Sequence, residues 1–122
     1  MGPASIFLGL RTVVYPVRDL GAAKAWYSAA LGLEPYFDQP FYVGYNVGGY
    51  ELGLLPDATE VGPVTYWGVA DAEAAQQRLL DLGATMSSPV HDVGDNIVLG
   101  TVRDPDGNLI GLITNPHFKL PA

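Results

Sequence analysis

Residues 17–32 read VRDLGAAKAWYSAALG, and residues 69–83, VADAEAAQQRLLDLG, follow the same plan. In both stretches a Val-x-Asp triplet ends an apolar run, a helical pattern follows, and Leu-Gly closes it. Asp is a favoured residue at the start of a helix and Gly is favoured just after its end. The two stretches therefore predict an internal repeat with about 50 residues in each half.

The segments around the two predicted helices repeat as well. Each helix follows a run rich in β-branched and aromatic residues, at 11–17 and 64–69, which is typical of a buried strand. Three further strands are expected after each helix, and turn residues such as Gly48-Gly49 separate them. These strands are predicted at 36–38, 41–47, 50–55, 85–90, 96–102 and 109–114. The order βαβββ, found twice, predicts an α+β fold of two modules with curved mixed sheets.

Helical spacing predicts one apolar face on each helix, packed against a sheet. The expected faces are Leu20, Ala23, Tyr27 and Ala30 in the first helix, and Ala72, Ala75, Leu79 and Leu82 in the second. Trp26 and Trp67 are assigned to the cores between helix and sheet.

Composition limits what the chain can do. Its 122 residues fit one domain, 1–122, with modules at about 8–56 and 63–115. A net charge of −7 disfavours nucleic acid, and no apolar run is long enough to cross a membrane. The chain has no cysteine, which excludes thiolate catalysis and sulfur-ligated metals. No signal pattern is seen at the N-terminus, so a cytoplasmic location is expected.

The chain resembles the vicinal oxygen chelate superfamily. The resemblance rests on the repeat, the two Val-x-Asp triplets, Trp26-Tyr27 and the DPDGN stretch of residues 104–108. This superfamily includes glyoxalase I, extradiol dioxygenases and bleomycin resistance proteins. The resemblance implies that the two modules form a cup-like cleft, which holds a divalent metal in the enzymes. It also implies a homodimer, for which residues 36–50 and Ile6-Phe7-Leu8 would supply the interface.

The resemblance implies four metal-ligand positions, one on the first strand and one on the last strand of each module. Here these positions carry Thr12, Gly53, Val64 and Gly111. None of these residues is a good ligand for a divalent ion. The two histidines, His91 and His117, lie outside the four positions and are expected on the surface. The sequence therefore predicts no metal and no cofactor, with open space in the cleft where the two glycines stand.

Glu51 is the candidate catalytic residue, because it lies two residues before Gly53 and so shares its face of the strand. A desolvated carboxylate can act as a general base or bind a ligand amine or guanidinium. A one-residue shift in register would instead turn Glu51 toward water, and the sequence leaves both readings open. The predicted ligand-binding residues are Thr12, Val14, Phe41, Glu51, Gly53, Val64, Tyr66, Gly111 and Ile113.

The leading functional hypothesis is a metal-free protein that sequesters a small hydrophobic or aromatic molecule, a property that would suit a resistance role. The alternative is a metal-independent isomerase or lyase that uses Glu51. A metalloenzyme of glyoxalase or dioxygenase type and a scaffold protein rank below both.

Overall fold

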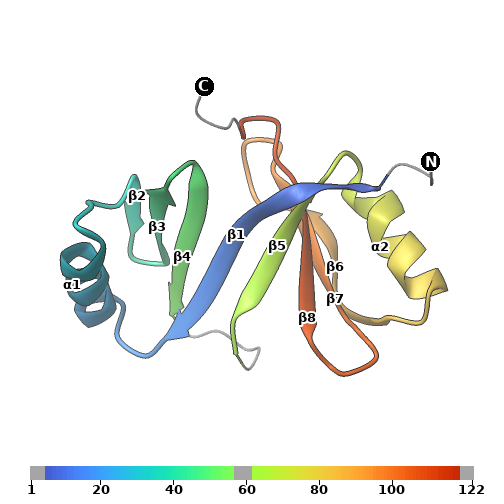
Figure 1. Ribbon diagram of the computed structural model, residues 1–122, viewed down its shortest axis with the longest axis horizontal. Helices are drawn as coiled ribbons and strands as arrows, with labels where there is room; N and C mark the ends of the chain where they lie inside the picture. Colours follow the sequence, from blue (N-terminus) through green and yellow to red (C-terminus); the bar gives the residue numbers. More distant parts are fainter. Residues whose placement is uncertain (1–4, 57–61, 119–122) are drawn as a thin grey trace. The chain divides into compact units, whose positions relative to one another are not determined.

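The computed structural model describes residues 5–56 and 62–118. The residues between the two predicted modules and those after residue 115 lie partly outside this range. The described part of the chain holds two helices and eight strands in the order βαβββ, found twice (Figure 1). The α+β fold of two βαβββ modules is thereby confirmed. The elements are β1 (Phe7–Val17), α1 (Leu20–Leu31), β2 (Phe37–Gln39), β3 (Tyr42–Val47), β4 (Tyr50–Pro56), β5 (Val64–Val69), α2 (Ala72–Asp81), β6 (Thr85–Asp92), β7 (Val98–Arg103) and β8 (Leu109–Thr114).

The described residues divide into two compact units. The first unit contains residues 12–56 and 62–64, and the second contains residues 5–11 and 65–118. Strand β1 is shared, because its part up to Arg11 groups with the second unit. The sequence repeat placed this whole strand in the first module.

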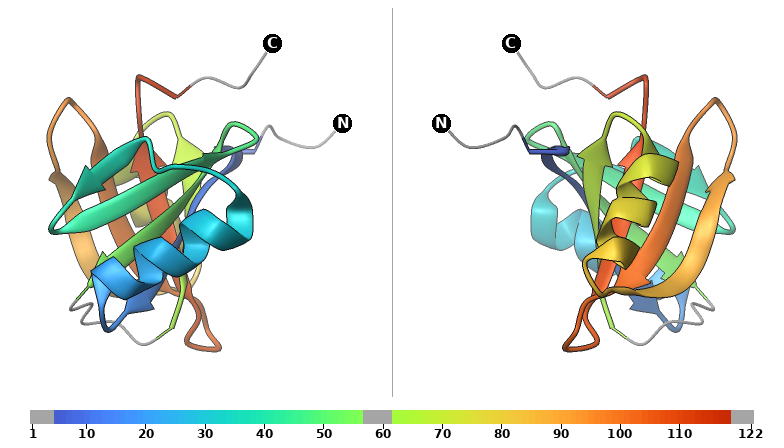
Figure 2. Two further views of the ribbon diagram at one scale, coloured as in Figure 1. Left: turned by 90° about the vertical axis from the view of Figure 1, so that its left-hand side faces the viewer. Right: turned by 90° about the vertical axis from the view of Figure 1, so that its right-hand side faces the viewer.

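In the first unit the strand order is β2-β3-β4-β1. Strand β1 pairs with β4 in parallel, while β3 pairs antiparallel with both β2 and β4. Helix α1 crosses one face of this sheet (Figure 2, left). Its residues Leu20, Ala23, Tyr27 and Leu31 pack against a core of Val43, Tyr45 and Leu54. Side chains of a strand alternate between the two faces of its sheet, so the neighbours of these core residues point to the face opposite α1.

In the second unit the strand order is β5-β8-β7-β6. Strand β5 pairs with β8 in parallel, and β7 pairs antiparallel with both β6 and β8. Helix α2 packs on one face of these strands (Figure 2, right). The core is formed by Val69, Ala72, Ala75 and Leu112. Trp67 is half-buried and packs against Phe7, with ring centroids 5.2 Å apart and the ring planes tilted by 58°.

The helix caps lie where the sequence predicts them. The Asp19 carboxylate accepts a hydrogen bond from the amide of Ala22 at 3.0 Å, and Asp71 accepts one from Ala74 at 3.1 Å. Gly32 ends α1 with φ of +67°, the left-handed conformation that glycine adopts without steric cost.

Three residues assigned to the cores lie elsewhere. Trp26 is 64% exposed and Leu82 is 63% exposed, while Ala30 is exposed and Leu31 takes its place in the core. Trp26 lies about 100° around the helix from Tyr27, which moves it off the buried face. Leu82 follows the last helical residue of α2, so helical spacing no longer applies to it.

The first strand begins earlier than predicted. Strand β1 starts at Phe7, so Phe7 and Leu8 belong to the strand and do not precede it. Towards the end of the same strand, Pro16 is exposed. Within residues 5–56 and 62–118 there is no helix of the length and apolar character needed to span a membrane.

Candidate functional site

Glu51 lies on the face of the first unit's sheet that is opposite helix α1. It pairs with Thr12 across β1 and β4, and Gly53 pairs with Val14 two residues further along. On the other side of β4, Gly44 of β3 pairs with Gly53. Because side chains two residues apart share a face, these residues line one surface. Tyr45 and Leu54 lie on the other surface, in the core.

Three hydroxyl groups converge on the Glu51 carboxylate. The Thr12 hydroxyl and the Tyr42 hydroxyl each donate to Oε1 at 3.0 Å. The Tyr36 hydroxyl donates to Oε2. The donors come from β1, from β3 and from the segment before β2, so folding is required to assemble them. We refer to Thr12, Tyr36, Tyr42 and Glu51 as the hydroxyl–carboxylate cluster.

Two glycines make room for the hydroxyl–carboxylate cluster. A Cβ atom on Gly53 would lie 1.8 Å from the Tyr42 hydroxyl, and one on Gly44 would lie 2.7 Å from Glu51 Oε2. Real Cβ atoms do not approach other atoms so closely, so both side chains rest directly on glycine backbone. The space expected to be open at Gly53 is therefore filled by the chain's own Tyr42.

Electrostatics keep the phenol of Tyr36 protonated. Burial of the hydroxyl end, followed by the hydrogen bond and the charge of Glu51, raises the pKa of Tyr36 well above its ordinary value. Tyr36 therefore donates a hydrogen bond to the carboxylate throughout the neutral range. In the described part of the chain the ion pair present is Lys24 with Asp38, and no cation pairs with Glu51.

Two further aromatic side chains, Phe37 and Phe41, extend from the tyrosines that contact this carboxylate. Phe37 lies edge-on to Phe41 and to Tyr42, with centroid distances of 5.9 Å and 6.0 Å. Tyr36 is 64% exposed and Phe41 is 63% exposed. Tyr36 thus places a water-accessible ring beside a half-buried negative charge, and Phe41 adds exposed ring surface next to Phe37.

The predicted site residues of the second unit have no carboxylate cluster of their own among the described residues. The Tyr66 ring covers Gly111, because a Cβ atom there would lie 2.4 Å from Tyr66 Cδ1. The space expected at this glycine is therefore also filled. Ile113 lines a separate cavity in this unit. Val64, in the first unit, is buried.

The four positions implied for a metal do not fit a divalent ion. Thr12 uses its hydroxyl on Glu51, Val64 has no donor atom, and tyrosine side chains occupy the space over Gly53 and Gly111. Among residues 5–56 and 62–118, no three His, Cys, Asp or Glu side chains gather in a way that could hold a metal. His91 and His117 are exposed, as expected, and their rings contact backbone oxygens of Pro89 and Asp95.

The sequence pattern of the Glyoxalase/Bleomycin resistance protein/Dioxygenase superfamily matches residues 9–112, most of the chain. The chain belongs to this superfamily. A comparison with curated proteins found no match. The region that matches the glyoxalase superfamily includes the whole hydroxyl–carboxylate cluster.

Solved structures share the fold. Methylmalonyl-CoA epimerase from Mycobacterium tuberculosis is 23% identical with a TM-score of 0.76, covering 95% of this chain and 94% of its own. A glyoxalase superfamily member from Vibrio splendidus 12B01 is 19% identical with a TM-score of 0.68, covering 87% and 99%. A variant of the Streptomyces coelicolor methylmalonyl-CoA epimerase, in complex with 2-nitronate-propionyl-CoA, is 19% identical with a TM-score of 0.73, covering 94% and 99%. At these identities the similarity shows the fold alone.

Sequence reasoning found Glu51 and Thr12 but missed what holds them together. Tyr36, Tyr42 and Gly44 are not among the site residues that the sequence predicts. The hairpin turn at Gly48-Gly49 contained the signal, since it pairs Gly44 with Gly53 and so places Tyr42 on the Glu51 face. Arg11 lines the cavity of the second unit, and it is part of no motif in the sequence.

Proposed function

We propose that this protein binds a small organic cation with an aromatic or apolar body. The observation that carries the proposal is the Glu51 carboxylate, which three hydroxyls hold in place and which no cation of the described chain neutralises. The oxygens of a carboxylate held in this way can accept hydrogen bonds from an ammonium or guanidinium group.

The neighbouring rings support a cationic ligand. Tyr36 contacts Glu51, and its exposed ring is joined by those of Phe37 and Phe41. The face of an aromatic ring attracts a cation. An apolar or flat ligand body would bury part of this surface. The chain's net charge of −7 would favour the approach of a cation.

A thermal-shift screen tests this function. 2-Phenylethylamine and larger aromatic amines are each compared with a neutral analogue, such as 2-phenylethanol. We expect the cations to raise the melting temperature and the neutral analogues to do little. Equal shifts for cations and neutral analogues would contradict the proposal.

Variants locate the site by calorimetric titration. Glu51→Gln keeps the shape of the side chain and removes its charge, so we expect a loss of affinity of tenfold or more, equivalent to about 1.4 kcal/mol. Glu34→Gln removes the same charge from an exposed position of the first unit and is expected to bind normally. Equal losses in the two variants would indicate that only net charge matters.

The proposed binding requires no metal. Elemental analysis of the purified protein is expected to find no stoichiometric Zn, Ni, Mn or Fe, and a chelator is expected to leave the melting temperature unchanged. A full equivalent of any of these metals would overturn this part of the proposal.

The pair of Tyr36 and Glu51 favours a second candidate, a metal-independent isomerase. A phenol that donates to a carboxylate forms a chain along which a proton can pass. Several solved structures of this fold are methylmalonyl-CoA epimerases. In D₂O such an enzyme would exchange a C–H proton of a bound ligand for deuterium, whereas a binding protein would return the ligand unchanged.

A further inference from the structure

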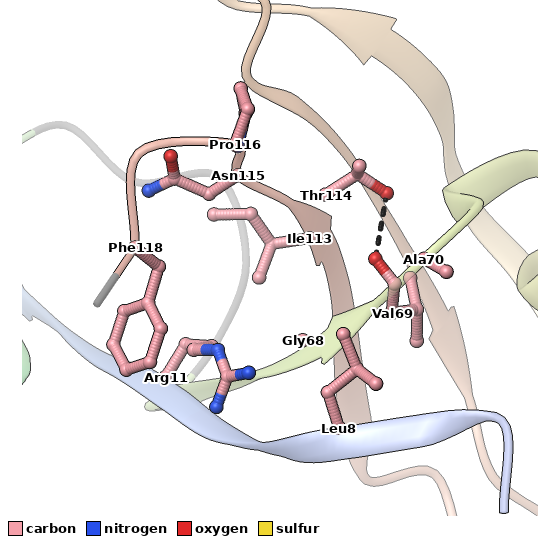
Figure 3. A pocket seen from close by; sticks show the side chains of 10 residues that line it. All are labelled: Leu8, Arg11, Gly68, Val69, Ala70, Ile113, Thr114, Asn115, Pro116 and Phe118. Atoms are coloured by element: carbon pink, nitrogen blue, oxygen red, sulfur yellow. Dashed lines mark hydrogen bonds between the residues drawn. The ribbon is translucent and has the colours of Figure 1, made fainter. Parts of the chain in front are cut away.

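The second unit contains a cavity of about 230 Å³ that shares no residue with the hydroxyl–carboxylate cluster (Figure 3). It is formed by the start of β1, the ends of β5 and β8, and the segment after β8. Leu8 and Ile113 form an apolar part of its wall. Arg11, Asn115 and Phe118 also line the cavity.

Arg11 is fixed in the wall of this cavity. Its guanidinium lies on the backbone of Gly68, where a Cβ atom would be 2.6 Å from Nε. The Phe118 ring covers it, with 3.9 Å between the ring centroid and the guanidinium carbon. Stacking on an aromatic ring orients the plane of the guanidinium and leaves its N–H edges free to donate.

Most of the hydrogen-bonding capacity of Arg11 is unused. A guanidinium has five N–H donors. Within residues 5–56 and 62–118 it makes one long hydrogen bond, to the Leu10 carbonyl oxygen at 3.4 Å, and no ion pair. In the described part of the chain, therefore, no carboxylate occupies the donor edge of this guanidinium.

A second donor and the size of the cavity define what would fit. The Asn115 side-chain oxygen accepts from the His117 amide at 2.9 Å, so its NH₂ group is left to donate. The volume is below the roughly 300–1,000 Å³ of sites for drug-sized ligands. The lining therefore fits a small ligand that has an anionic group next to Arg11 and a compact apolar body.

We propose that this cavity binds a small monocarboxylate. The carboxylate would accept paired hydrogen bonds from Arg11, a geometry that guanidinium and carboxylate share. The apolar body of the ligand would lie against Ile113 and Leu8. This site is independent of the proposed cation site, because it belongs to the other unit and selects the opposite charge.

Titration with benzoate, followed by NMR of the ¹⁵N-labelled protein, tests the proposal. We expect the Arg11 Nε–H resonance to shift in a saturable way, and the neutral analogue benzamide to produce no such shift. Inorganic phosphate serves as a second probe. A response to phosphate equal to that for benzoate would show a site for any anion and overturn the carboxylate assignment.

Three variants make the test specific. Arg11→Met is expected to weaken benzoate binding by roughly tenfold or more, because charge-assisted hydrogen bonds are lost. Arg11→Lys keeps the charge without the paired donors and is expected to bind with intermediate affinity. Arg78→Met removes a charge from an exposed site on α2 and is the matched control. Unchanged affinity in both Arg11 variants, or no saturable shift in the wild type, would overturn the proposal.

Discussion

At the level of single residues, the missing side chain of Gly53 determines where Tyr42 lies. Because a Cβ atom at this position would be 1.8 Å from the Tyr42 hydroxyl, any other residue must displace the ring. Tyr42 would then lose its hydrogen bond to Glu51. A glycine at a position where the resemblance implies a metal ligand thus serves a different purpose here.

The first prediction is that Gly53→Ala destabilises the chain by about 1–3 kcal/mol, the usual cost of overpacking. In a Tyr42→Ala background the added methyl has room, so the same change should cost much less. Urea denaturation of the four proteins in this double-mutant cycle measures the difference. Equal costs in both backgrounds would show that Tyr42 does not lie over Gly53.

The second prediction concerns Tyr36 and pH. The folded pKa of Tyr36 is raised above its ordinary 10.0, so the folded chain keeps a proton that the unfolded chain has lost. The stability from this group is therefore complete below pH 10.0 and is lost as the pH rises through the folded pKa. Tyr36→Phe should therefore flatten the fall in melting temperature above pH 10.0. An unchanged slope in Tyr36→Phe would contradict the assigned hydrogen bond.

At the level of elements, helix α1 carries two exposed glycines with opposite roles. Gly21 lies in the first turn, where a Cβ atom would have an ordinary contact of 3.6 Å with Asp19. Gly32 follows the last turn with φ of +67°, and a Cβ atom there would meet nothing within 4 Å. Position 32 therefore requires glycine because of its backbone conformation and not because of a lack of space.

The third prediction follows from this contrast. Gly32→Ala should destabilise the chain by about 1 kcal/mol, because alanine is strained in the left-handed conformation. Gly21→Ala should be neutral or should stabilise by about 0.5–1 kcal/mol, since alanine favours the helix. Chemical denaturation of both variants measures the two changes. A stabilising Gly32→Ala would mean that α1 does not end in this conformation.

At the level of the whole molecule, exposed apolar residues support the expectation of a homodimer. Ile6 is 41% exposed, Leu8 is 63% exposed and Phe41 is 63% exposed, and all three belong to the segments proposed for the interface. Exposed apolar side chains of this size commonly mark association surfaces.

The fourth prediction is therefore a mass of about 26 kDa in solution, twice the 13.0 kDa of one chain. An obligate interface would bury on the order of 2,000 Å² or more. Light scattering coupled to size exclusion measures the mass, and Leu8→Glu should shift the equilibrium toward monomer. A wild-type chain that stays monomeric at micromolar concentration would contradict the prediction.

The parts of the fold that depend on local physics could be predicted from the amino-acid sequence. The helix caps at Asp19 and Asp71 and the turn at Gly48-Gly49 follow from hydrogen bonds and backbone conformations within a few residues. The order of helices and strands in each half follows from the periodicity of apolar residues along the chain. Residues near a helix end or off its central face, such as Leu82 and Trp26, were misplaced. The periodicity of apolar residues predicts which face of a helix is buried. It does not predict how far the sheet extends beneath that face.

What the chemically active side chains touch could be learned from the folded chain alone. The donors to Glu51 come from three segments, and the stacking of Arg11 on Phe118 joins residues near the two ends of the chain. Such contacts depend on strand register and on the height of each side chain above the sheet. A one-residue change in register would turn Glu51 to the opposite face. Both candidate sites are therefore products of tertiary structure, formed by residues that carry no motif in the sequence.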